Sequence, residues 1–239
     1  MWPPPRKTAR LEHRSAPLIE PTASTQLMEL SVTTRFLAAG AMTALLALSA
    51  LAPQAMAQEI ATKDPNAVRA GDYKVEPYHT QIGFSISHLG FTDLSGFFSG
   101  VSGTLTLDPE KIGIAKLDVS FPVQSLLTTV SVLDDQLKSD QWFDTAKFPT
   151  ATFVSTTVTM TGSNTATIVG NLELHGVTKP VTLNARLIGS GDDPWLKLYT
   201  VGFEATGEIK RSDFNITQFL PAVGDEVTLT IAGSFVLGS

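Results

Sequence analysis

Apolar and polar residues alternate along most of the chain beyond residue 71. The clearest stretch runs over 80–88, where Ile82, Phe84 and Ile86 recur at every second position and the residues between them are small or polar. Successive side chains of a β-strand point to opposite faces of the sheet. The pattern therefore predicts a strand over 80–88 with one apolar face.

The same alternation returns in later segments, separated by short clusters rich in Gly, Pro, Asp and Ser. A turn over 93–96 is expected to lead into a second strand in which Phe97, Val101 and Leu105 share the apolar face. Strands are expected over 72–75, 80–88, 96–107, 115–123, 150–155, 166–174, 181–187, 201–209 and 227–237.

One short segment has helical spacing instead. Leu133 and Leu137 are four residues apart in 131–137, and Ser131 is a suitable N-cap. We expect this helix to lie over one opening of the sheet structure, and the loop over 211–224, with Phe214, to border a rim.

The expected strands contain no pattern of alternating strands and long helices that would indicate a parallel sheet. A meander of antiparallel strands either stacks as a sandwich or closes into a barrel. Small residues recur on the inward faces, and a ring of about eight strands encloses room for one elongated ligand. These small residues are Gly103, Gly170, Ala185, Ala205, Gly207 and Gly233.

The N-terminal region has the features of a secretory leader. Arg35 precedes an apolar run over 36–51, and Ala55-Met56-Ala57 follows it. A membrane anchor is the alternative, but a span needs ~20 apolar residues and the small-x-small end is typical of signal-peptide cleavage. We predict cleavage near Ala57 and a periplasmic or secreted protein. The expected parts are an extension over 1–27, a signal peptide over 28–57 that starts at Met28, a flexible lead-in over 58–71 and a barrel domain over 72–239.

Composition removes several classes of function. The chain has no cysteine, which excludes disulfides and thiolate metal sites, and its net charge of −6 disfavours a nucleic-acid partner. His79 and His88 lie roughly 30 Å apart along one strand and cannot share a metal ion. No Gly-x-Ser-x-Gly elbow occurs, and the adjacent Asp pairs are typical of solvated surface. We therefore expect no enzyme activity, no metal and no cofactor.

The motifs, taken in order, resemble those of the YceI-like family of secreted bacterial polyisoprenoid-binding proteins. The likeness covers nearly all of 72–235. It is carried by Tyr78-His79-Thr80-Gln81-Ile82-Gly83-Phe84-Ser85-Ile86-Ser87-His88, Gly96-Phe97-Phe98, Phe148-Pro149-Thr150-Ala151-Thr152-Phe153, Gly170-Asn171-Leu172-Glu173-Leu174-His175-Gly176 and Arg211-Ser212-Asp213-Phe214.

This resemblance implies an all-β, antiparallel, lipocalin-like β-barrel of about eight strands with one short helix near an opening. It also implies an isoprenoid lipid or quinone as the bound ligand and no catalytic residues. Arg211 and Lys210 could meet an anionic head group or pair with a nearby carboxylate. The residues expected to bind the ligand are Ile82, Phe84, Ile86, His88, Phe97, Val101, Leu105, Leu117, Val119, Phe121, Leu133, Leu137, Phe153, Ile168, Leu172, Leu183, Phe203, Phe214, Leu229 and Ile231.

Three alternatives stay open at this point. Inward aromatic residues could fill the barrel, which would leave a ligand-free, stress-related structural or interaction protein. A secreted hydrolase is disfavoured because no nucleophile arrangement is visible. The carrier hypothesis expects a protein without stable membrane insertion, acting as a monomer or homodimer.

Overall fold

The computed structural model describes residues Ile60–Gly238. The predicted extension, signal peptide, start at Met28 and cleavage near Ala57 lie outside the described residues. These described residues belong to one compact unit, which contains all of the elements below and their core.

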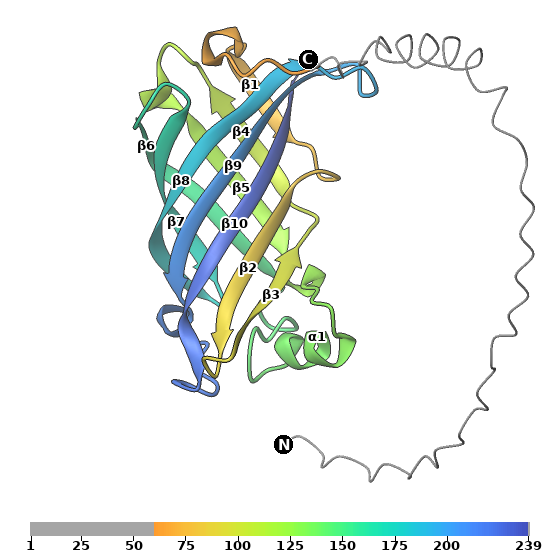
Figure 1. Cartoon of the computed structure of the whole chain (residues 1–239), viewed down its shortest axis with the longest axis vertical. Coiled ribbons are helices and arrows are strands. Elements are labelled where there is room, and N and C mark those ends of the chain that lie inside the picture. Colours follow the sequence, from red (N-terminus) through yellow and green to blue (C-terminus); the bar gives the residue numbers. More distant parts are fainter. Residues whose placement is uncertain (1–59, 239) are drawn as a thin grey trace, which may run out of the picture. The chain divides into compact units, whose positions relative to one another are not determined.

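Ten antiparallel strands make a single sheet (Figure 1). The strands are β1 (Gly71–Val75), β2 (Gln81–His88), β3 (Thr92–Phe98), β4 (Ser102–Leu107), β5 (Lys116–Pro122), β6 (Thr150–Met160), β7 (Thr165–Leu174), β8 (Val177–Asp192), β9 (Tyr199–Lys210) and β10 (Val223–Leu237). The helical elements are α1 (Ser131–Lys138) and the 3₁₀ turns η1 (Pro65–Ala67), η2 (Ile112–Ile114), η3 (Val123–Ser125) and η4 (Arg211–Phe214).

The sheet closes because β1 pairs with two strands. Its residues Gly71–Lys74 pair with β4, while Tyr73–Val75 pair with the end of β10. The ring β1-β4-β5-β6-β7-β8-β9-β10 is therefore complete. The hairpin of β2 and β3 pairs with the first part of the same edge of β10, over residues 223–232. This confirms the expected antiparallel barrel with one short α-helix.

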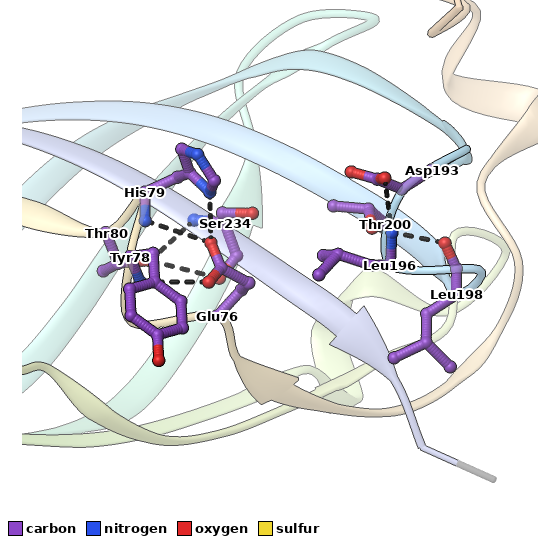
Figure 2. Close-up of polar contacts among 9 residues, drawn as sticks. All are labelled: Glu76, Tyr78, His79, Thr80, Asp193, Leu196, Leu198, Thr200 and Ser234. Atoms are coloured by element: carbon purple, nitrogen blue, oxygen red, sulfur yellow. Dashed lines mark hydrogen bonds and ion pairs between the residues drawn. The ribbon is translucent and has the colours of Figure 1, made fainter.

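A buried carboxylate stabilises the turn between β1 and β2, the two strands that pair with successive parts of β10. The Glu76 side chain is 4% exposed and accepts hydrogen bonds from the backbone amides of Tyr78 and His79, both at 3.0 Å. The His79 ring lies against the same carboxylate, with Nδ1 2.6 Å from Oε2 (Figure 2). Thr80 then exchanges two hydrogen bonds with the backbone of Ser234 in β10. His79 thus lies in the bend before β2 and not in the strand itself.

The prediction of a single strand over 96–107 is wrong. The turn lies over residues 89–91, so β3 begins at Thr92, and the chain breaks again before β4. Gly100, in the break, has a φ of +69°, a conformation that suits glycine. The break shifts the alternation by one residue. Phe98 therefore faces the interior, and Phe97, which was expected to line it, is 48% exposed on the outer side.

Small inward-facing residues leave space for the aromatic rings of neighbouring residues as well as for the cavity. A Cβ added to Gly170 in β7 would lie 2.4 Å from the ring of Phe153 and 2.7 Å from the carbonyl oxygen of Val154. The Phe153 ring, on the neighbouring strand β6, occupies the place that a side chain at residue 170 would take. Glycine at this position therefore sets how far Phe153 reaches into the barrel.

Substitution of Gly170 tests this contact. We expect Gly170→Ala to lower the free energy of unfolding of residues 58–239 by about 1–3 kcal/mol, since the Phe153 ring and the strand must shift. Urea unfolding monitored by circular dichroism measures the change. Gly202→Ala is the matched control, because its added Cβ meets no atom nearer than 3.8 Å. Equal stability of the two variants would contradict the proposed packing.

Candidate ligand-binding cavity

The barrel encloses a cavity of about 810 Å³ that is lined mainly by apolar side chains. These side chains come from the inward-facing positions of the strands, where the alternation of each strand points them. Of the residues predicted to bind ligand, the structure places the following on the cavity wall: Ile82, Phe84, Val101, Leu105, Leu117, Val119, Phe121, Phe153, Ile168, Leu172, Leu183, Phe203, Leu229 and Ile231. Their contact with a ligand stays a prediction.

The middle of the barrel is hollow. Leu117, Ile168 and Ile231 face inward and yet are only partly buried. The barrel wall shields these side chains from outside solvent, so the surface that they expose borders the cavity. A barrel plugged by its own side chains would bury them as completely as it buries Ala151 and Val201, which are 0% exposed. The filled-barrel alternative is therefore not what the structure shows.

Aromatic rings close one end of the cavity. Phe98 lies at the centre of this floor, with its ring centroid 5.7 Å from that of Phe84, 5.1 Å from Phe121 and 5.7 Å from Phe143. Tilted and edge-to-face contacts at these distances are favourable between aromatic rings. Helix α1 lies at this end of the barrel in Figure 1. The helix near an opening was expected to border the ligand, but its Leu133 and Leu137 pack with the core and do not line the cavity.

The mouth lies at the other end of the barrel, where three loops carry several of the polar residues of the cavity wall. Asn66 comes from η1, Glu110 from the turn between β4 and β5, and Ser163 from the turn between β6 and β7. All three residues are exposed. The segment expected to be a flexible lead-in thus contributes η1 to the rim, and Val68 just after it is 7% exposed and lines the cavity. The cavity is apolar in its depth and polar at its rim.

Six of the predicted residues do not line this cavity. His88 is exposed at the end of β2, and Ile86 is buried one inward position nearer the hairpin turn than the floor residue Phe84. Leu137 and Phe214 are 5% and 1% exposed within the core at the closed end. The complete list is Ile86, His88, Phe97, Leu133, Leu137 and Phe214. Alternation and helical spacing indicated that these residues face inward or lie on an apolar face. These patterns do not indicate at which height along the barrel each residue lies.

The cavity wall also contains residues that were not predicted to bind. Ile209, Val227 and Phe235 lie on the same alternating faces as predicted neighbours, so the strand pattern contained the signal for them. Phe98 required knowledge of the break at Gly100. Val68 and Phe143 lie outside the strands, and no periodic pattern marks them.

Arg211 does not meet a ligand head group. Its side chain is 4% exposed at the closed end, where Nε donates to the Gly224 carbonyl at 2.7 Å, Nη1 to Ile216 at 2.8 Å and Nη2 to Val223 at 2.9 Å. The guanidinium also lies 5.4 Å from the Trp142 ring centroid. Burial lowers the pKa of Arg211, and the Asp225 carboxylate opposes that shift. Arg211 therefore holds the 211–224 loop against the barrel.

Among residues 60–238, no group of three or more His, Asp or Glu side chains is arranged to hold a metal ion. Within the same residues, no helix has the length and apolar character needed to cross a membrane.

Comparison with known proteins agrees with this architecture. Residues 73–235 match the family model of the YceI-like domain. Protein YceI of Salmonella arizonae is 44% identical over 165 residues, which cover 68% of this chain and 85% of the relative.

Solved structures share the fold. The YceI protein of Campylobacter jejuni superposes with a TM-score of 0.56 and 28% identity, over 64% of this chain and 91% of the other. A polyisoprenoid-binding domain from Saccharophagus degradans, implicated in plant cell wall breakdown, gives a TM-score of 0.51 at 16% identity, over 71% of this chain and all of the other. At that identity the second likeness shows the fold alone.

Removal of the Arg211 side chain tests its structural role. We expect Arg211→Met to lower the free energy of unfolding of residues 58–239 by about 3 kcal/mol, because three carbonyl groups lose a charged donor. Arg186→Met is the control, since Arg186 forms an exposed ion pair with Glu204 at 2.7 Å, and such pairs contribute about 0–1 kcal/mol. Chemical unfolding of both variants measures the difference. A loss no larger than that of the control would contradict this role.

Proposed function

The chain belongs to the YceI-like family, and from that premise we propose that its cavity binds the long apolar chain of an isoprenoid lipid or a quinone. Binding would serve storage or transport of the lipid in the periplasm, after removal of the predicted signal peptide. The observation that carries this proposal is the mainly apolar cavity inside the barrel, with partly accessible inner side chains and exposed polar residues at its rim. The Saccharophagus degradans domain with the same fold is described as polyisoprenoid-binding, which supports the same class of ligand.

The energetics favour recognition through the tail. An isoprene unit contributes five carbons, and burial of each CH₂ is worth ~0.8 kcal/mol, so one unit offers roughly 3–4 kcal/mol before ordering costs. The cavity is within the range of about 300–1,000 Å³ that is typical of small-molecule sites. A few buried units therefore suffice for tight binding. The rim residues Asn66, Glu110 and Ser163 would meet the head group without setting the affinity.

The proposal includes no catalytic step. The cavity depth is lined by apolar side chains, so it provides neither a nucleophile nor a general base beside a buried ligand. The polar groups of the rim are exposed, where they serve solubility and orientation of a head group. The alternative of a ligand-free structural or interaction protein requires a filled interior, which the partly accessible inward side chains do not support.

Tail length should control affinity. We expect residues 58–239 to bind quinones with the same ring more tightly as the tail grows from one to several isoprene units, because each added unit buries more apolar surface. Quenching of intrinsic fluorescence in a titration series measures the dissociation constants. Ring-substituted quinones of one tail length serve as controls and should differ little. Equal affinity for short and long tails would contradict tail recognition.

Filling the cavity should weaken binding without unfolding the barrel. Ala205 on β9 lines the cavity, whereas its neighbour Thr206 points outward and is exposed. We expect Ala205→Trp to weaken the binding of a long-tailed quinone at least tenfold and Thr206→Trp to leave it unchanged. Circular dichroism verifies the fold of both, and Ala166→Phe, nearer the mouth, is a second filling variant. Unchanged binding by folded Ala205→Trp would place the ligand outside the barrel.

Native mass spectrometry of the protein purified from its periplasm tests the ligand class directly. An adduct with the mass of an isoprenoid lipid is the expected result. A protein that stays bare, even after incubation with long-tailed quinone, would overturn the proposed function.

A further inference from the structure

Exposed apolar side chains surround the open end of the barrel. The largest is Trp195, 81% exposed in the 193–198 loop between β8 and β9. Ile114 of η2 lies beside cavity-lining residues of the mouth and is 56% exposed, and Met160 at the end of β6 itself lines the cavity and is 44% exposed. We call this set the rim patch; it consists of Ile60, Ile114, Met160, Trp195, Leu196 and Leu198.

The 193–198 loop is held in one conformation by its own hydrogen bonds. The Asp193 carboxylate accepts from the amides of Trp195 at 2.8 Å and Leu196 at 2.9 Å, and the Asp193 amide donates to the Leu198 carbonyl at 2.9 Å. Figure 2 shows the Asp193 carboxylate facing the Leu196 amide. The loop thus presents Trp195 to solvent from a fixed backbone. Several large apolar side chains exposed at one end of a protein are a candidate interaction surface.

Polar contacts join this loop to the rim of the cavity. Arg69 forms two hydrogen bonds of 3.0 Å with Asp192 at the base of the loop, and its guanidinium lies 4.1 Å from the Tyr199 ring centroid. The Tyr199 hydroxyl donates to the Ala67 carbonyl of η1 at 2.7 Å. Because η1 supplies Asn66 to the cavity wall, the rim patch is continuous with the mouth.

We propose that the rim patch docks the open end of the barrel on the interfacial zone of a lipid bilayer, with Trp195 as its anchor. An indole has an apolar body and one N–H donor, and it is enriched where membrane meets water. Two acidic side chains near the patch are paired locally, Asp192 with Arg69 at 3.0 Å and Asp108 with Lys111 at 3.5 Å, whereas Glu110 at the mouth is exposed. The chain as a whole carries a charge of −6, so apolar insertion drives docking, and attraction to anionic lipid does not.

The closed end also exposes apolar residues, among them Phe91 at 85%. Aromatic rings seal the cavity there, so a bilayer at that end would not meet the mouth. Docking at the open end places the apolar interior next to the acyl chains. The inference goes beyond the proposed function in naming a surface and its partner, and it is tested without any ligand, so either can fail alone.

The experiment uses residues 58–239 and vesicles of phosphatidylcholine. Only two tryptophans lie beyond residue 57, and Trp142 is 7% exposed at the closed end. We expect the protein to float with the vesicles and lipids brominated on their acyl chains to quench Trp195 fluorescence, while the Trp142 component stays unquenched. Trp195→Ala should lower vesicle partitioning about tenfold or more, through loss of the buried ring. Phe91→Ala, an equally exposed aromatic at the other end, should partition as the unchanged protein does.

Three results would overturn the proposal. They are absence of the protein from the floated vesicles, partitioning that Trp195→Ala leaves unchanged, and a loss with Phe91→Ala that equals or exceeds the loss with Trp195→Ala. Absence from vesicles combined with Trp195-dependent capture of a protein would reassign the rim patch to a protein partner.

Discussion

The width of a closed ring of eight strands is the constraint on which this structure depends. Once β1 pairs with both β4 and β10, every second side chain must point into one shared interior, which eight strands make just wide enough either to be filled by side chains or to hold one small ligand. The strands are individually simple, half polar and half apolar. Their closure converts several apolar faces into one enclosed wall, on which Ile168 and Ile231 remain partly accessible.

The two ends of the barrel resolve this constraint differently. At one end, Phe98 contacts three other rings, and the loop held by Arg211 lies at the same end, so that end is a packed core. At the other end, short loops leave the cavity open, and polar groups such as Asn66 contact solvent there. A cavity with one sealed end and one open end admits an elongated apolar molecule in a single direction. The proposed carrier function and the proposed bilayer contact both use that asymmetry.

Much of the cavity could be predicted from alternation because a strand has a period of two, so burial on one face is written directly into the order of residues. Phe84, Leu105 and Ile231 were found in this way. Prediction failed where the period was interrupted. Gly100 shifts the alternation between β3 and β4, which exchanges Phe97 for Phe98. It also failed for Leu137, because helical spacing shows an apolar face but not which surface covers it.

By itself, the sequence determined the strand-forming segments, the short helix and which face of most strands is apolar, since these follow from local periodicity and turn residues. Only the tertiary structure decided that the interior is hollow, which end is sealed and that Arg211 belongs to the packed end. Those properties depend on the distances between segments far apart in the chain. For example, hydrogen bonds of Glu76 and Ser234 hold the segment between β1 and β2 against β10. The order of residues does not indicate such distances, because closure of the barrel depends on all of its strands together.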